Sequence, residues 1–148
     1  MKKAMIILLS AALVLMAVSC ASNAGQAKSE ELSVKGSAGD YAYVIRTCGS
    51  DLTFEIEGNP TTGYQWQLMT ESDSFTVTSD YTQNAAPEGF VGVGGCFRFD
   101  IAFQADGTYK LDFSYLRSWA PDDGPVNLSL NGTGEKGEIT GAMVDTVE

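Results

Sequence analysis

The strongest constraint on this chain is an alternation of apolar and polar residues that recurs in five separate segments. A period of two places successive side chains on opposite faces of a β-strand, and no long stretch has the 3.6-residue period of an amphipathic helix. With shorter candidates at 41–46 and 75–78, the pattern predicts about seven strands, each with one buried face. The apolar residues of the five segments are Leu52, Phe54 and Ile56; Tyr64, Trp66 and Leu68; Phe97, Phe99, Ile101 and Phe103; Tyr109, Leu111, Phe113 and Tyr115; and Val126, Leu128 and Leu130.

Turn-forming sequences separate the predicted strands. They read "CGSD", "GNPTTG", "APEGFVGVGG", "QADGT" and "APDDGP" and are rich in the residues that turns require. Short strands joined in this way are typical of an antiparallel β-sandwich, and 148 residues suit one such domain. We place this domain at residues 40–131. Residues 132–148 form a C-terminal extension that holds either an extra edge strand around 139–144 or a loose end.

The N-terminal residues indicate export. Lys2 and Lys3 precede an apolar run at 4–18 that is shorter than the roughly 20 residues of a membrane-spanning helix. The run ends in "AVSC", which resembles the cleavage box of bacterial lipoproteins. We therefore expect a signal peptide at 1–19, then lipid attachment at Cys20 and a flexible tether within 20–39. The protein would be anchored to the cell envelope, facing the periplasm or the surface; plain secretion without lipid is the alternative.

Charge and composition exclude several classes of function. The net charge is −10, so nucleic acid is not an expected partner because no basic patch exists to replace its counterions. The chain has no histidine, which removes Ser-His-Asp and Cys-His catalysis and the commonest zinc ligand. We expect no enzyme activity, no cofactor and no metal.

Three of the turn sequences have features that a turn alone does not require. In "NPTTGY", Asn59, Pro60 and Gly63 suit a tight turn, and the stiff β-branched Thr61 and Thr62 would lose little entropy on binding. An ordinary turn before Tyr64 is the alternative.

The second loop is "GFVGVGGC". Gly92, Gly94 and Gly95, with Val91, would leave backbone exposed to a partner; a flexible connection is the alternative. A phosphate-binding loop is a weak interpretation, because neither a lysine nor a helix follows.

The third loop is "YLRSWAPDDGP". It contains Arg117 and Trp119, residue types that often dominate binding interfaces. The alternative places the tryptophan on the core with the arginine stacked above it.

Together, "NPTTGY", "GVGG" and "RSW" resemble, in order and spacing, the chagasin family of inhibitors of papain-like cysteine peptidases. The family motifs are NPTTG followed by an aromatic residue, GxGG and RPW; Ser118 replaces the proline of the third. The resemblance implies an immunoglobulin-like β-sandwich whose three loops form a wedge. Thr61 and Thr62 would then lie over the catalytic cysteine of a peptidase, with the loops at 92–95 and Arg117/Trp119 on either side.

The two cysteines of the predicted domain should lie at opposite ends of the sandwich. Cys48 precedes the strand that leads to the first loop, and Cys96 follows the second loop. A strand of about seven residues spans roughly 20 Å, whereas a disulfide needs Cα atoms within about 7 Å. We therefore expect both cysteines to be unpaired.

The sequence leaves other functions open. An immunoglobulin-like adhesion or assembly module could use the same loops without inhibiting a peptidase. An inhibitor of a different secreted hydrolase, such as lysozyme, is a third possibility, and an enzyme is the fourth.

Overall fold

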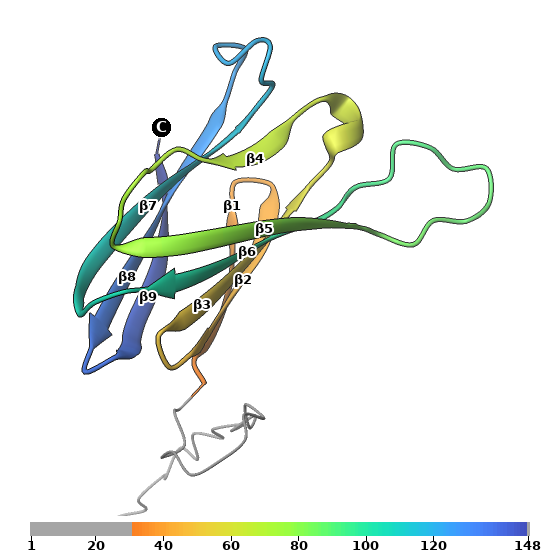
Figure 1. Cartoon of the computed structure of the whole chain (residues 1–148). Helices are drawn as coiled ribbons and strands as arrows, with labels where there is room; N and C mark the ends of the chain where they lie inside the picture. Colours follow the sequence, from red (N-terminus) through yellow and green to blue (C-terminus); the bar gives the residue numbers. More distant parts are fainter. Residues whose placement is uncertain (1–30, 148) are drawn as a thin grey trace, which may run out of the picture.

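The computed structural model describes residues 31–147. Within them the chain forms two antiparallel sheets, ordered β1-β2-β3-β6-β5 and β4-β7-β8-β9 (Figure 1). This confirms the predicted all-β, immunoglobulin-like antiparallel sandwich, although the described residues contain nine strands rather than about seven. The elements are β1 (Ser33–Ala38), β2 (Tyr41–Cys48), β3 (Asp51–Gly58), the 3-10 helix η1 (Pro60–Thr62), β4 (Gln65–Leu68), β5 (Phe75–Gln83), β6 (Gly95–Phe103), β7 (Gly107–Leu116), β8 (Val126–Glu135) and β9 (Glu138–Val147).

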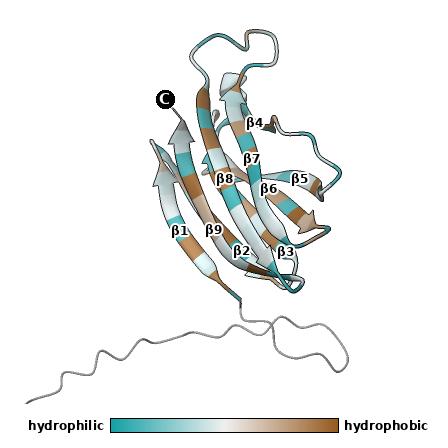
Figure 2. Cartoon of the chain, turned by 90° about the vertical axis from the view of Figure 1, so that its left-hand side faces the viewer, coloured by the Kyte–Doolittle hydropathy of each residue, from teal (hydrophilic) through white to brown (hydrophobic). Residues whose placement is uncertain are grey.

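The alternating apolar residues form the core between the two sheets. Phe54 of one sheet packs against Phe113 of the other with ring centroids 5.3 Å apart, and Phe99 lies 4.8 Å from Phe113. Hydrophobic bands alternate with hydrophilic ones along the strands in Figure 2. Burial of one face per strand supplies the main stabilising free energy, as the sequence pattern predicts.

Two strands lie outside the predicted domain limits. β1 falls within the segment expected to be a tether, yet it pairs with β2 from Ser33↔Arg46 to Ala38↔Tyr41, and Ala38 is fully buried. The tether therefore does not extend to residue 39. The apolar pattern of the sequence does not reveal β1, because backbone hydrogen bonds to β2 stabilise most of this strand and only a small part of it is buried.

At the other terminus the extension contains the edge strand β9, which is longer than the expected 139–144. β8 continues to Glu135, so the predicted boundary after residue 131 lies inside a strand. Lys136 and Gly137 both have positive φ and form the tight turn that joins β8 to β9. Residues 132–147 are therefore part of the sandwich.

The strand register brings the three loops to one end of the sandwich. Gly58↔Gly95 pairs the end of β3, where the first loop begins, with the start of β6, where the second loop ends. Gln65↔Leu116 pairs the first residue after the first loop with the last residue before the third. The first loop crosses from one sheet to the other and so lies between its two neighbours.

The N-terminal end of the described chain lies at the opposite end of the sandwich. The carbonyl of Leu32 accepts a 2.9 Å hydrogen bond from the amide of Thr47, next to the β2–β3 turn. In Figure 1, β1 begins at the bottom, whereas η1 and the third loop lie at the top. No helix in residues 31–147 is long and apolar enough to cross a membrane.

The cysteine prediction is correct for one residue and wrong for the other. Cys96 is free. Cys48, however, is disulfide-bonded, and its partner is not Cys96. Cys96 pairs with Glu57 near one end of β3, while Cys48 pairs with Asp51 at the other end. That separation excludes a bond between the two, but it never excluded a different partner for Cys48. Cys20 and the expected signal peptide lie outside the described residues.

Candidate functional site

The first loop is a single 3-10 turn that Asn59 organises. Its Oδ1 accepts a hydrogen bond from the amide of Thr61 at 3.2 Å, as an N-cap residue does. Pro60 supplies the fixed φ of the first turn position, and Gly63 ends the turn with φ +86°. The amide of Gly63 donates to the carbonyl of Pro60 at 2.9 Å, as the turn sequence predicted.

Both threonines are exposed at the tip of this turn, and both hydroxyl groups are used within it. Thr61 Oγ1 donates to Asn59 Oδ1 at 2.6 Å, and Thr62 Oγ1 donates to the carbonyl of Asn59 at 2.6 Å. With χ1 already restricted by β-branching, these bonds make the tip a rigid projection.

Asn59 also connects the first loop to the second. Its Nδ2 donates a 2.8 Å hydrogen bond to the carbonyl of Gly92, which has φ +77°. Val91, the preceding residue, is 95% exposed. One side chain therefore caps the first loop and holds the second beside it.

The glycines of the second loop do not all expose backbone, contrary to expectation. Gly95 is buried, and a Cβ there would lie 2.2 Å from the carbonyl oxygen of Thr82. A Cβ on Gly94 would lie 3.1 Å from the carbonyl oxygen of Gly58. These two glycines let neighbouring strands approach closely, and only Val91 and Gly92 of the predicted set are exposed here.

The third loop lies against the opposite side of the first. Trp119 is 71% exposed, and its ring covers Gly63, where a Cβ would approach the ring to 2.6 Å. The tryptophan is therefore not part of the core. Its contact with Gly63 explains why this glycine matters beyond its backbone conformation.

Arg117 is engaged inside the loop. Its Nη1 forms a 2.9 Å ion pair with Asp123, and its guanidinium lies 4.5 Å from the centroid of the Tyr64 ring. The arginine therefore stacks on Tyr64 and not on Trp119. The structure brings all the predicted loop residues to one end of the sandwich, but it gives Arg117 and Tyr64 internal contacts.

Comparison with known proteins assigns the family. Residues 47–131, more than half of the chain, match the family described as "Chagasin family peptidase inhibitor I42". The chain belongs to the chagasin family. Its members are peptidase inhibitors and not enzymes.

Two curated proteins and one solved structure are similar to this chagasin-family chain. Amoebiasin-1 of Entamoeba histolytica is 31% identical over 85 residues, which cover 56% of this chain and 82% of that protein. Chagasin of Trypanosoma cruzi is 27% identical over 77 residues, covering 48% of this chain and 68% of that protein. The solution structure of amebosin is 30% identical, covers 56% of this chain and 78% of its own, and has a TM-score of 0.47.

The exposed tips of this chagasin-family chain include one residue that the motifs did not identify. Phe90 is 69% exposed in the second loop, next to Val91. Exposed large apolar side chains on neighbouring loops mark an interaction surface. The signal in the sequence was the adjacent pair "FV" within a glycine-rich loop, where no strand pattern explains an aromatic residue.

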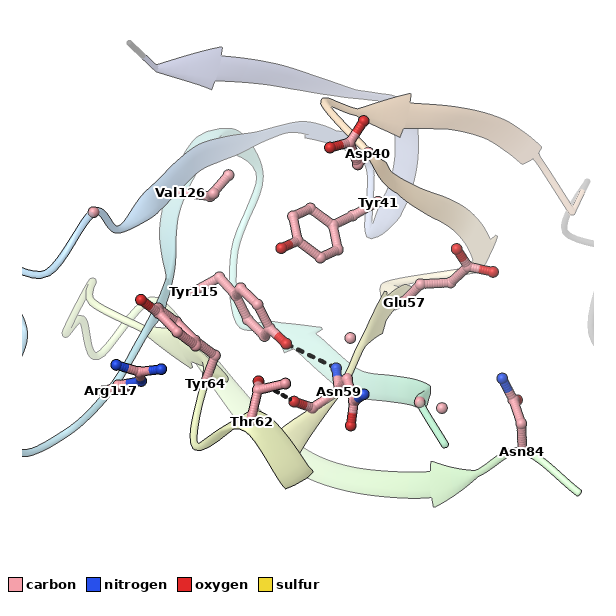
Figure 3. A pocket seen from close by; sticks show the side chains of 14 residues that line it. Asp40, Tyr41, Glu57, Asn59, Thr62, Tyr64, Asn84, Tyr115, Arg117 and Val126 are labelled. Carbon is pink, nitrogen blue, oxygen red and sulfur yellow. Dashed lines mark hydrogen bonds between the residues drawn. The ribbon is translucent and has the colours of Figure 1, made fainter. Parts of the chain in front are cut away.

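A hollow of about 740 Å³ lies beside the first loop (Figure 3). Three tyrosines line it: Tyr115 lies 5.0 Å from Tyr41 and 5.4 Å from Tyr64 between ring centroids. Burial raises the pKa of Tyr41, and the nearby Tyr115 adds to the rise, so its phenol stays neutral at ordinary pH. Aromatic rings thus form part of the lining of the hollow, together with the charged side chains of Asp40, Glu57 and Arg117.

Two chemical features of the described residues bear on metal binding and on thiol reactivity. Within 31–147, no group of three His, Cys, Asp or Glu side chains could hold a metal ion. Burial raises the pKa of the Cys96 thiol, and Glu55 and Glu57 raise it further, so the thiolate is disfavoured. The geometry of the three loops suits binding.

Proposed function

We propose that this protein is a reversible, tight-binding inhibitor of papain-like cysteine peptidases that blocks the active-site cleft with its three loops. The observation that supports this most directly is the joining of the loops into one unit. Asn59 Nδ2 bonds to the second loop at 2.8 Å, and Trp119 of the third loop packs on Gly63 of the first. A wedge built this way loses little conformational freedom when it enters a cleft.

In this proposal the first loop occupies the position of the scissile peptide without being cleaved. Attack by a cysteine thiolate requires a carbonyl held in near-attack geometry beside it. The carbonyl of Asn59 accepts hydrogen bonds from both the amide and the hydroxyl of Thr62, and that of Pro60 accepts one from Gly63. Because the turn already uses these carbonyls, they are not free to move into an oxyanion hole.

The other two loops would contact the walls of the cleft on either side. Phe90 and Val91 present apolar surface from the second loop, and Trp119 presents an indole from the third. Aromatic anchors of this kind contribute a large share of binding free energy at interfaces. Thr61 and Thr62 would lie between them, over the catalytic cysteine.

Titration of active papain with the purified protein tests this proposal, with hydrolysis of a fluorogenic peptide as the readout. We expect competitive inhibition at nanomolar concentration and an inhibitor that remains uncleaved. Thr62→Arg should abolish inhibition without unfolding the protein, because Thr62 is exposed. Thr76→Arg, on an exposed position of β5, is the matched control and should inhibit like the wild type. A folded wild-type protein that fails against papain and its relatives would instead favour an adhesion or assembly module.

We also propose that the protein is exported and anchored through a lipid on Cys20. Support comes from the "AVSC" box and from the position of Leu32 at the end of the sandwich opposite the loops. An anchor there would leave the wedge pointing away from the membrane. Acylation would use the sulfur of Cys20 in a thioether, and the same sulfur could then form no disulfide. The intact mass of the detergent-extracted protein shows whether acyl chains are attached. A mass without acyl chains would rule out the anchor.

A further inference from the structure

We infer that Asp123 is a positioning residue for inhibition: through Arg117 and Tyr64 it fixes the third loop so that Trp119 stays against the first loop. This inference rests on the proposed function for its effect on inhibition. The conformational part is separately measurable.

Asp123 is held at two points. Its carboxylate accepts a 2.9 Å hydrogen bond from Arg117 Nη1, and its backbone carbonyl accepts a 2.9 Å hydrogen bond from the Tyr64 hydroxyl. The guanidinium of Arg117 in turn lies 4.5 Å from the centroid of the Tyr64 ring. The three residues close a triangle in which each contacts the other two.

The triangle adds side-chain contacts between segments that the strand pairs Gln65↔Leu116 and Tyr115↔Val126 already bring together. Arg117 stands at the start of that loop and Asp123 near its end, while Tyr64 follows the first loop directly. Trp119 lies between the two ends that the ion pair joins. The ion pair therefore restrains the segment that carries Trp119, whose ring packs on Gly63.

The Arg117 side chain makes its contacts within the protein rather than extending into solvent. It is only partly exposed, and its Nε is buried without a hydrogen-bond partner in the described structure. Figure 3 shows the side chain beside Tyr64 at the rim of the hollow. Arg117 packs on the Tyr64 ring and pairs with the Asp123 carboxylate. We therefore expect it to affect peptidase binding mainly by fixing the conformation of the third loop.

The loop needs such a restraint because Ser118 stands between Arg117 and Trp119. Proline would lock φ at this position, whereas serine leaves it free. Local hydrogen bonds form two turns, from Ala120 to the carbonyl of Arg117 at 3.0 Å and from Asp123 to that of Ala120 at 3.1 Å. The ion pair adds a side-chain link between Arg117 and Asp123, which lie on either side of these turns.

The neighbouring Asp122 provides a matched control. It is exposed and has the same charge, and its carboxylate takes no part in the triangle. Asp123→Ala and Asp122→Ala therefore remove the same group from adjacent positions. For each variant we would measure the inhibition constant for papain, the melting temperature and the NMR order parameter of the Trp119 backbone amide.

We expect Asp123→Ala to weaken inhibition about tenfold, since a loop that must be ordered on binding loses affinity. The Trp119 order parameter should fall from about 0.85 to below about 0.6, with the melting temperature almost unchanged. Asp122→Ala should match the wild type in all three measurements. Adding Arg117→Ala to Asp123→Ala should cost little more than either change alone, because the two residues act as one unit.

Equal behaviour of the two alanine variants, in both Trp119 order and inhibition, would overturn the inference. If the wild type does not inhibit papain, the proposed function fails, yet a fall in Trp119 order confined to Asp123→Ala still supports the positioning role. If the wild type inhibits and Asp123→Ala inhibits equally with an ordered Trp119, only the positioning role fails.

Discussion

The backbone amide of Asn59 donates a 2.7 Å hydrogen bond to the hydroxyl of Tyr115. Asn59 follows β3 of one sheet, and Tyr115 lies on β7 of the other, so this bond joins the two sheets directly beneath the first loop. The Tyr115 ring is buried against Trp66, with centroids 5.0 Å apart. The hydroxyl of a core aromatic residue thus helps to fix the position of the first loop relative to the two sheets.

Removal of that hydroxyl should destabilise the fold and loosen the turn. Tyr115→Phe leaves the amide of Asn59 without its partner, so we expect a loss of about 1–3 kcal/mol in the free energy of unfolding and weaker inhibition. Tyr109→Phe is the control, because the Tyr109 hydroxyl is buried without a hydrogen-bond partner in the described structure. That change should be neutral or slightly stabilising in urea denaturation. Equal losses for both variants would contradict this role of Tyr115.

A methyl group at Gly63 should displace Trp119. Gly63→Ala combines an unfavourable φ of +86° with a Cβ 2.6 Å from the indole. Gly39→Ala has a similar backbone penalty, with φ +60° and no atom within 4 Å of the added Cβ. Each should lose about 1–3 kcal/mol in unfolding free energy. Only Gly63→Ala should shift the Trp119 indole resonance and weaken papain inhibition; an unshifted resonance would disprove the packing.

The two tryptophans should separate binding from stability. Trp119 is exposed, so Trp119→Ala should weaken inhibition at least about 30-fold, the size of a binding hot spot, with little change in unfolding free energy. Trp66 is 4% exposed in the core, and Trp66→Ala should lose about 3–5 kcal/mol of stability. Titration against papain and urea denaturation measure the two effects. Full inhibition by Trp119→Ala would remove the third loop from the interface.

Asp106 should make the β8–β9 turn sensitive to acid. Its carboxylate accepts hydrogen bonds from the amides of Gly137 and Lys136, at 2.8 and 2.7 Å, and these bonds lower its pKa below 3.8. A lowered pKa stabilises the fold fully above the ordinary value, and this stabilisation is lost as pH falls through the folded value.

The melting temperatures of the wild type and Asp106→Ala should therefore differ most near neutral pH. The difference should shrink as the pH falls below about 4. Asp106→Asn keeps one acceptor and should fall between the two at neutral pH. A difference that does not change with pH would show that the ionised carboxylate is not what the turn requires.

The sequence predicted the strands whose burial is one-sided. Leu52, Phe54 and Ile56 alternate with polar residues because one face of β3 is buried in the core, and this alternation can be read from the sequence alone. β1 escaped because its sequence "SVKGSA" has one fully buried residue, and a ladder of backbone hydrogen bonds leaves no trace in composition.

The motifs located the candidate site but not the contacts that shape it. The turn chemistry of Asn59, Pro60 and Gly63 follows from local conformational preferences, and the structure has it as expected. The bond from Asn59 to Gly92 joins residues 33 positions apart, and its existence depends on the register of β3 with β6. The glycines of the second loop also looked alike in sequence, although packing gives Gly95 and Gly92 different roles.

The two ends of the described chain have unequal consequences for protein engineering. Val147, the last residue of β9, pairs with Asn127, one residue after the third loop rejoins the sheet at Val126. A fluorescent protein or purification handle fused there would lie close to the three loops and, under the proposed function, would compete with a bound peptidase. The same fusion placed ahead of Leu32 would leave these loops open, which makes the N-terminal side the right choice for immobilising this scaffold on a sensor chip or displaying it on a phage.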